Sequence, residues 1–165
     1  MAQVWLVTGS SRGLGRAIVE AGLAAGNKVL ATARGIESLA DLSERYGDQV
    51  KLFALDVTDE AAAANAVMSA IDLFGSLDVV INNAGYGNLS SIEDTHLSEF
   101  RAQTETNLFE TIIVTKAALT YFRERKTATS FSFHPWAEGS ALRDVGLIPR
   151  RNGVSKASLK CCHAK

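Results

Sequence analysis

The sequence contains few of the residues and patterns that mark secreted or membrane proteins. Its 165 residues include only two prolines and two cysteines, and the cysteines are adjacent, at Cys161 and Cys162. Because adjacent cysteines provide no disulfide framework, we expect a reducing, cytoplasmic location. No apolar run approaches the length of a membrane span, and the N-terminus lacks the basic flank and cleavage site of a signal peptide. With 17 Lys plus Arg against 18 Asp plus Glu, the composition predicts neither a nucleic acid nor a membrane as partner.

The near balance of charge conceals two different compositions along the chain. Residues 1–126 hold 11 basic and 16 acidic side chains, whereas residues 127–165 hold 6 basic and 2 acidic ones. The second part also contains both prolines, both cysteines and two of the three histidines. We therefore predict an ordered domain over 1–126 and an irregular tail over 127–165.

Residues 1–126 alternate between strand-like and helix-like patterns, which is typical of a parallel sheet covered by helices. We expect strands at Val4–Val7, Lys28–Ala33, Val50–Leu55 and Leu77–Ile81, with a fifth at Thr129–Phe133. We expect helices at Leu14–Ala25, where Gly26 ends the helix, at Glu37–Tyr46, from a cap at Thr58 or Asp59 to Phe74, and at Leu97–Arg125. The predicted fold class is α/β, a doubly wound parallel sheet truncated after its fourth or fifth strand.

A glycine-rich segment, Thr8-Gly9-Ser10-Ser11-Arg12-Gly13-Leu14-Gly15, connects the first predicted strand to the first predicted helix. Glycines let the backbone turn tightly and come close to a pyrophosphate, whose charge the helix N-terminus stabilises. A glycine-rich connection without a ligand is the alternative, but the position between a strand and a helix favours a phosphate site.

Two further motifs follow in order along the chain. Leu55-Asp56-Val57-Thr58 comes after the third predicted strand, and Asn82-Asn83-Ala84-Gly85 comes after the fourth. Together with the T-G-x-x-x-G-x-G spacing at 8–15, they make residues 3–126 resemble the short-chain dehydrogenase/reductase family. The resemblance implies a Rossmann-like fold, a nicotinamide cofactor and the interconversion of a small-molecule alcohol and a carbonyl compound. It also implies a homo-oligomer, which is common in that family.

The resemblance implies a role for each matching residue. The pyrophosphate and adenosine side would be lined by Gly9, Ser11, Arg12, Gly13, Leu14 and Gly15. Asp56 and Val57 would meet the adenine, and the ribose and nicotinamide would lie along Asn83, Ala84 and Gly85. The structural alternatives are a turn aspartate at Asp56 and a strand-end turn at Asn82-Asn83.

Asn107, in the pair Thr106-Asn107, falls where that family places the asparagine of its catalytic tetrad. The resemblance implies that Asn107 helps to position a water molecule in a proton relay. The alternative is a polar residue on a helix face, which is common in any amphipathic helix.

The choice of cofactor depends on the residue that follows the second predicted strand. An acidic residue there would accept hydrogen bonds from the 2′-hydroxyl of NAD. The chain instead has Arg34 at this place, and Arg12 in the glycine-rich segment. Two guanidinium groups can hold a 2′-phosphate by charge-assisted hydrogen bonds, although two solvated surface arginines are the alternative. We therefore predict NADP rather than NAD.

The chemistry of that family also needs Tyr-x-x-x-Lys, in which the tyrosine transfers a proton. Tyrosine occurs only at Tyr46, Tyr86 and Tyr121, and none is followed four residues later by lysine. The tail can also be considered in a shifted reading frame, in which the third base of each codon is combined with the first two bases of the next codon. In that frame, the codons of residues 147–162 permit Y-S-A-A-K-W-G-V-E-G-F-S-E-V-L, in which tyrosine and lysine are four residues apart. Residues 127–147 permit G-H-I-I-Q-F-S-S-V-G-G-R-V-G-S-P-G-R-G-A, which supplies the active-site serine.

We therefore hypothesise a reading-frame shift near Arg125–Thr127, with an evolved basic, partner-binding tail as the alternative. The expected function is an NADP-dependent oxidoreductase that is inactive as written; a non-catalytic NADP-binding module and an inert fragment are the alternatives. No metal site is expected, because Cys161-Cys162-His163 lacks the usual ligand spacing. An unfinished sheet with an exposed edge predicts poor solubility.

Overall fold

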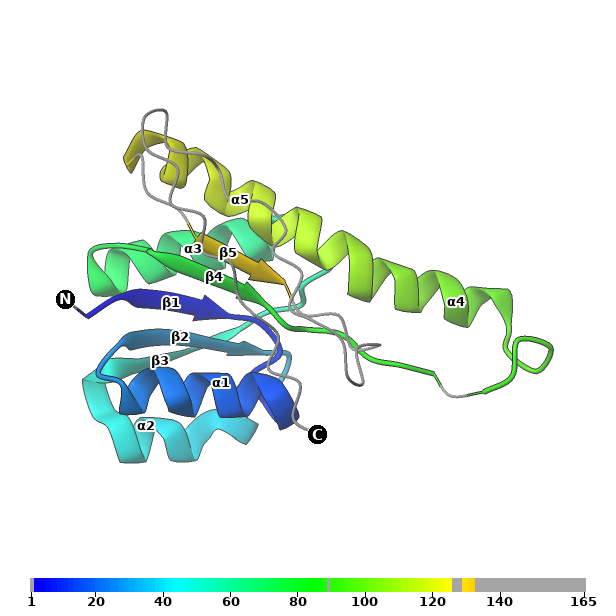
Figure 1. Ribbon diagram of the computed structural model, residues 1–165, viewed down its shortest axis with the longest axis horizontal. Helices are drawn as coiled ribbons and strands as arrows, with labels where there is room; N and C mark the ends of the chain where they lie inside the picture. Colours follow the sequence, from blue (N-terminus) through cyan, green and yellow to red (C-terminus); the bar gives the residue numbers. More distant parts are fainter. Residues whose placement is uncertain (1, 89, 126–128, 133–165) are drawn as a thin grey trace, which may run out of the picture.

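The computed structural model describes residues 2–88, 90–125 and 129–132. Within them, five parallel strands form one sheet in the order β3-β2-β1-β4-β5 (Figure 1). The strands are β1 (Val4–Val7), β2 (Lys28–Ala33), β3 (Val50–Ala54), β4 (Val79–Asn82) and β5 (Thr129–Ser132). The predicted bounds of β1 and β2 are confirmed, and those of β3 and β4 differ by one or two residues at their ends. Phe133 and the rest of the predicted tail lie outside the described residues.

Helices cover both faces of the sheet, which confirms the doubly wound α/β fold. Helices α1 (Gly13–Ala24) and α2 (Ala40–Tyr46) cover one face, and α3 (Glu60–Phe74) and α5 (Glu110–Arg125) cover the other (Figure 1). Because successive side chains of a strand point to opposite faces, the core divides into two apolar clusters. Leu6 and Val80 pack beneath α3 and α5, while Val7 and Val79 pack beneath α1 and α2.

The connections on the α2 side are short. Two 3₁₀ turns, η1 (Ile36–Leu39) and η2 (Gly47–Gln49), flank α2, so the helix predicted at Glu37–Tyr46 is 3₁₀ in its first turn. Helix α1 ends just before Gly26, whose φ of 83° is the left-handed conformation expected of a glycine after a helix end. Surface ion pairs connect α1 with α2, because Arg16 of α1 binds Asp41 of α2 and Glu20 of α1 binds Arg45 of α2.

The helix predicted at Leu97–Arg125 is not regular throughout. It consists of α4 (Leu97–Thr104), a π-helical turn η3 (Glu105–Phe109) and α5. A π turn inserts an extra residue into a helical turn, and such turns occur frequently at functional sites. Asn107 lies inside this turn, so the irregularity falls at the residue that the family resemblance selects.

Asp59, and not Thr58, caps α3: its Oδ1 accepts hydrogen bonds from the backbone N–H groups of Ala61 and Ala62 at 2.8 and 3.0 Å. We expect Asp59→Ala to lower the free energy of unfolding by about 1 kcal/mol, because it leaves these donors without their partner. Urea denaturation measures the loss. Asp59→Asn keeps an acceptor oxygen at this position, so an equal loss in both variants would contradict the capping role.

Candidate functional site

A cleft of about 1000 Å³ lies at the carboxyl ends of the strands. Strand β1 has β2 on one side and β4 on the other, and ligands of doubly wound sheets bind where the strand order reverses in this way. All of the predicted cofactor-binding residues line this cleft: Gly9, Ser11, Arg12, Gly13, Leu14, Gly15, Arg34, Asp56, Val57, Asn83, Ala84 and Gly85. Sequence reasoning missed the other lining residues, which are Ala33, Leu55, Tyr86, Gly87, Ala102 and Thr106.

The glycine-rich loop packs tightly against the segment that follows β4. A Cβ atom on Gly15 would lie 2.3 Å from the Asn83 side-chain nitrogen and 2.3 Å from the Gly9 carbonyl oxygen. A Cβ atom on Gly9 would lie 2.8 Å from the Cα atom of Ala84. Side chains at these two positions would therefore separate the loop from the β4 segment.

Asn83 holds the same two segments together by hydrogen bonds. Its side-chain nitrogen donates to the carbonyl oxygens of Thr8 and Gly9, both at 3.1 Å. This half-buried amide therefore fixes the shape of the loop, while the residue also lines the cleft.

Thr8 is a further component of the site that sequence reasoning did not single out. Its buried hydroxyl accepts hydrogen bonds from the backbone N–H groups of Asn83 at 2.9 Å and Ala84 at 3.0 Å. The same hydroxyl donates to Oε1 of Glu110 at 2.7 Å. The available signal was its place as the first, polar residue of the glycine motif, directly after an apolar strand.

Glu110 lies at the start of α5, and only 1% of its surface is exposed. Burial raises the pKa of this carboxyl from its ordinary value to about 7, and hydrogen bonds from Thr8 and Thr111 oppose part of that rise. Sequence reasoning missed Glu110 because nothing in its neighbourhood distinguishes it from the exposed acidic residues of the same helix.

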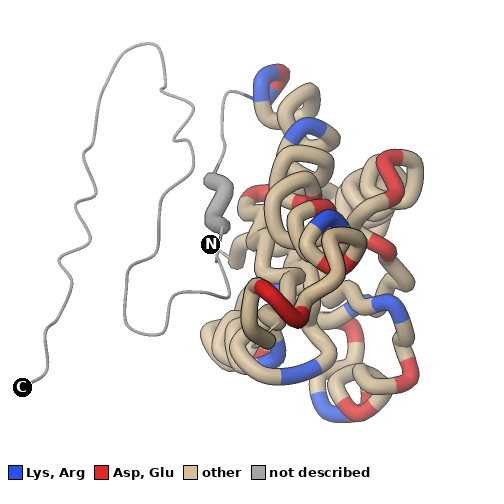
Figure 2. Tube along the Cα trace, turned by 90° about the vertical axis from the view of Figure 1, so that its right-hand side faces the viewer, with Lys and Arg blue, Asp and Glu red and all other residues tan. Residues whose placement is uncertain are grey.

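The cleft holds two arginines and a carboxylate. Arg12 and Arg34 are exposed, and neither forms a salt bridge with any residue in the part of the chain that the structure describes. Asp56 accepts hydrogen bonds from the backbone and hydroxyl of Thr58, and these lower the pKa of Asp56, with a smaller contribution from the charge of Arg34. Elsewhere, basic and acidic residues are interspersed (Figure 2).

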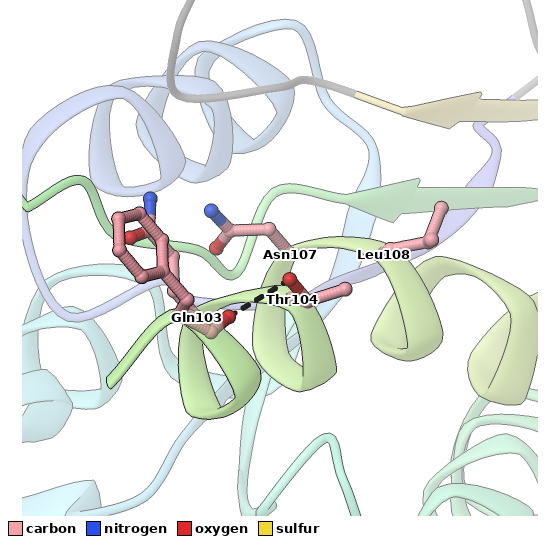
Figure 3. A pocket seen from close by; sticks show the side chains of 5 residues that line it. Gln103, Thr104, Asn107 and Leu108 are labelled. Atoms are coloured by element: carbon pink, nitrogen blue, oxygen red, sulfur yellow. Dashed lines mark hydrogen bonds between the residues drawn. The ribbon is translucent and has the colours of Figure 1, made fainter. Parts of the chain in front are cut away.

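Asn107 is connected to the cleft by two hydrogen bonds to the backbone of Tyr86, which lines the cleft. Its side-chain nitrogen donates to the Tyr86 carbonyl at 2.8 Å, and its side-chain oxygen accepts from the Tyr86 N–H at 3.0 Å. Asn107 does not line the large cleft. It lines a separate hollow of about 260 Å³ together with Phe100, Gln103, Thr104 and Leu108 (Figure 3).

The sequence predicts neither a metal site nor a membrane-spanning helix. Over 2–88, 90–125 and 129–132, no group of three or more His, Cys, Asp or Glu residues could hold a metal ion. Cys161-Cys162-His163 lies outside that part of the chain. In the same described ranges, no helix is long and apolar enough to cross a membrane.

Comparison with known proteins gives consistent matches. The family model described as short chain dehydrogenase matches residues 3–129. The oxidoreductase BOA17 of Botryotinia fuckeliana is 47% identical over 132 residues, which are 79% of this chain and 48% of that protein.

Solved structures match over the same part. A short-chain dehydrogenase from Streptomyces avermitilis has a TM-score of 0.75 and 39% identity, covering 80% of this chain and 49% of that one. ElxO with NADP bound has a TM-score of 0.74 and 26% identity, covering 80% and 55%. The chain thus spans about half the length of the relatives that it matches.

Proposed function

Because the chain belongs to the short-chain dehydrogenase/reductase family, we propose that its cleft binds NADP(H) and that the intact protein interconverts an alcohol and a carbonyl compound. One observation carries this proposal: three segments far apart in sequence, at 9–15, 56–57 and 83–85, line one cleft at the strand ends. When bound, the nicotinamide would donate or accept the hydride. The substrate class is inferred from the family alone.

The cleft fits a dinucleotide. The glycine-rich segment runs into the N-terminus of α1, where the helix dipole favours a pyrophosphate. Gly13, which has a φ of 58°, has no atom within 4 Å of where its Cβ would lie, so the loop presents bare backbone there. Val57 would contact the adenine, and Ala84 and Gly85 would contact the ribose and nicotinamide.

Within this proposal, Arg12 and Arg34 would bind the 2′-phosphate that distinguishes NADP from NAD. Both line the cleft, and no described carboxylate neutralises either one by a salt bridge. The NADP bound to ElxO, a relative with the same fold, is consistent with this choice. Asp56 lies in the same cleft, and hydrogen bonds from Thr58 lower its pKa. Its negative charge would help to orient Arg34 without forming a salt bridge with it.

We expect Arg34→Ala to weaken NADP⁺ binding by roughly 10- to 100-fold, because a charge-assisted hydrogen bond contributes about 1.5–3 kcal/mol. NAD⁺ binding should change much less, since NAD⁺ lacks the 2′-phosphate. Fluorescence titration with both cofactors measures the ratio. Arg123→Ala, an exposed change on α5, is the control. Equal losses for NADP⁺ and NAD⁺ would rule out 2′-phosphate recognition by Arg34.

The proposal also includes the division of the chain. The match to the family model ends at residue 129, close to the change in composition between 126 and 127. This supports a cofactor-binding domain over 1–126, and we propose that residues 127–165 stand in a shifted reading frame. The nucleotide sequence of codons 120–165 tests it, because third bases that exclude the alternative letters would refute the shift.

A second candidate function is a non-catalytic NADP-binding module. It is favoured by the presence of the cofactor segments together with the absence of Tyr-x-x-x-Lys from the sequence. Cofactor binding without hydride transfer to a panel of carbonyl compounds is the expected result for the chain as written. Detectable turnover would contradict it, and absence of cofactor binding would point to an inert fragment.

A further inference from the structure

Glu110 is a buried acid that the proposed function does not use. In the described residues whose burial is known, it is the one ionisable side chain that is buried. It lies behind the wall of the cleft and does not line it. Its contact with the site is indirect and passes through the hydroxyl of Thr8.

The Thr8 hydroxyl has no hydrogen-bonding capacity left over. A hydroxyl group has one hydrogen to donate and two lone pairs that accept. The two lone pairs accept the N–H groups of Asn83 and Ala84, at 2.9 and 3.0 Å. The hydrogen goes to Glu110 at 2.7 Å, since the other acceptor within reach, the Ile81 carbonyl, is 3.4 Å away.

We propose that Glu110 is a positioning residue whose proton controls dinucleotide affinity through Thr8. An ionised Glu110 can only accept, so it takes the Thr8 hydrogen and leaves both lone pairs to Asn83 and Ala84. A protonated Glu110 can instead donate to Thr8 and compete with those two N–H groups. This inference rests on the proposed function, because Ala84 is taken to line the bound cofactor.

The titration that this mechanism needs falls near neutral pH, because burial raises the pKa of Glu110 to about 7. Strands β1, β4 and β5 carry no ionisable residue. Helix α3 carries Glu60 and Asp72, η3 carries Glu105, and α5 carries Lys116, Tyr121, Arg123, Glu124 and Arg125. None of these charges contributes to the shift, whose causes are burial and the two threonine hydroxyls.

The test compares NADP⁺ affinity at pH 6 and pH 8 for the wild type, Glu110→Gln and the control Glu105→Gln, an exposed acid in the adjacent turn. The 2′-phosphate of NADP⁺ itself titrates near pH 6, so the variant is compared with the wild type at each pH. From pH 6 to pH 8, we expect the NADP⁺ affinity of the wild type to rise roughly fivefold more than that of Glu110→Gln. A fivefold change corresponds to the net free energy of about one hydrogen bond. Glu105→Gln should follow the wild type.

Calorimetry in two buffers of different ionisation enthalpy provides a second readout. Because binding and protonation are linked, cofactor binding at pH 7 should release protons from the wild type, and fewer from Glu110→Gln. Equal release, or equal pH responses, would overturn the inference while leaving cofactor binding intact. Failure of the wild type to bind NADP⁺ at either pH would instead overturn the proposed function and this inference together.

Circular dichroism checks that each variant is folded. If Glu110→Gln does not fold, the wild type with NAD⁺, which lacks the 2′-phosphate, carries the test. A proton release on NAD⁺ binding at pH 7 supports the inference, and its absence overturns it.

Discussion

Replacing Gly15 by alanine is expected to abolish dinucleotide binding, whereas replacing Gly13 is expected only to weaken it. A Cβ atom on Gly15 would lie 2.3 Å from the Gly9 carbonyl oxygen, a backbone atom that cannot move unless the loop moves. The same Cβ would displace the Asn83 side chain that joins the loop to β4. We expect a loss of NADP⁺ affinity of at least about 100-fold, with overpacking lowering the free energy of unfolding by about 1–3 kcal/mol.

Gly13→Ala is the matched control, since the same methyl group is added two residues earlier in the same loop. No atom lies within 4 Å of the added Cβ, so the expected cost is only that of the left-handed backbone at φ 58°. That cost is about 1–2 kcal/mol for a residue with a side chain. Fluorescence titration and urea denaturation of both variants measure the contrast. If Gly13→Ala lost as much affinity as Gly15→Ala, close packing at Gly15 would not be the cause.

Glu110→Gln is expected to stabilise the protein at pH 8 and to have little effect at pH 4.5. The folded state binds the Glu110 proton more tightly than the unfolded chain does, because the pKa rises from 4.5 to about 7. The stability that the neutral carboxyl contributes is therefore complete below pH 4.5, declines between pH 4.5 and 7, and is lost above pH 7. At 1.36 kcal/mol per pKa unit, the loss amounts to about 3 kcal/mol.

The measurement is the difference in free energy of unfolding between Glu110→Gln and the wild type, at pH 4.5 and at pH 8. Urea denaturation is expected to give a difference that grows by about 3 kcal/mol in favour of the variant over this range. Glu105→Gln is the control for the loss of one charge at an exposed position. A difference that stays constant with pH would mean that Glu110 does not titrate in this range.

Most of the fold and of the cleft could be predicted from local patterns. Short apolar runs located β1 and β2 at their observed bounds, and Gly26 marked the end of α1. The predicted cofactor-binding residues all line one cleft. The predictions of strand bounds and of the helix end are confirmed because glycine turns, helix caps and strand ends depend on a few neighbouring residues. Parallel strands then bring their carboxyl ends to one edge of the sheet.

Local patterns could not reveal the π turn η3 or the role of Glu110. Helical periodicity predicts a helix through 97–125, but no local pattern showed where an extra residue would be inserted into a turn. Glu110 and Thr8 are 102 residues apart, and only the pairing of β1 with β4 and the packing of α5 bring them within 2.7 Å. The burial that raises the pKa of Glu110 arises from the same packing.

The sequence by itself determined the family, the α/β fold and the residues at the strand ends, because motif chemistry is encoded in adjacent residues. It also determined that Tyr-x-x-x-Lys is absent and that the composition changes after residue 126. Only the tertiary structure decided that Asn83 holds the glycine loop, that Asn107 forms hydrogen bonds with the backbone of Tyr86, and that Glu110 is a buried acid. The physical reason is that burial and hydrogen-bond partners arise from segments far apart in the chain, which meet only when the sheet and its helices have formed.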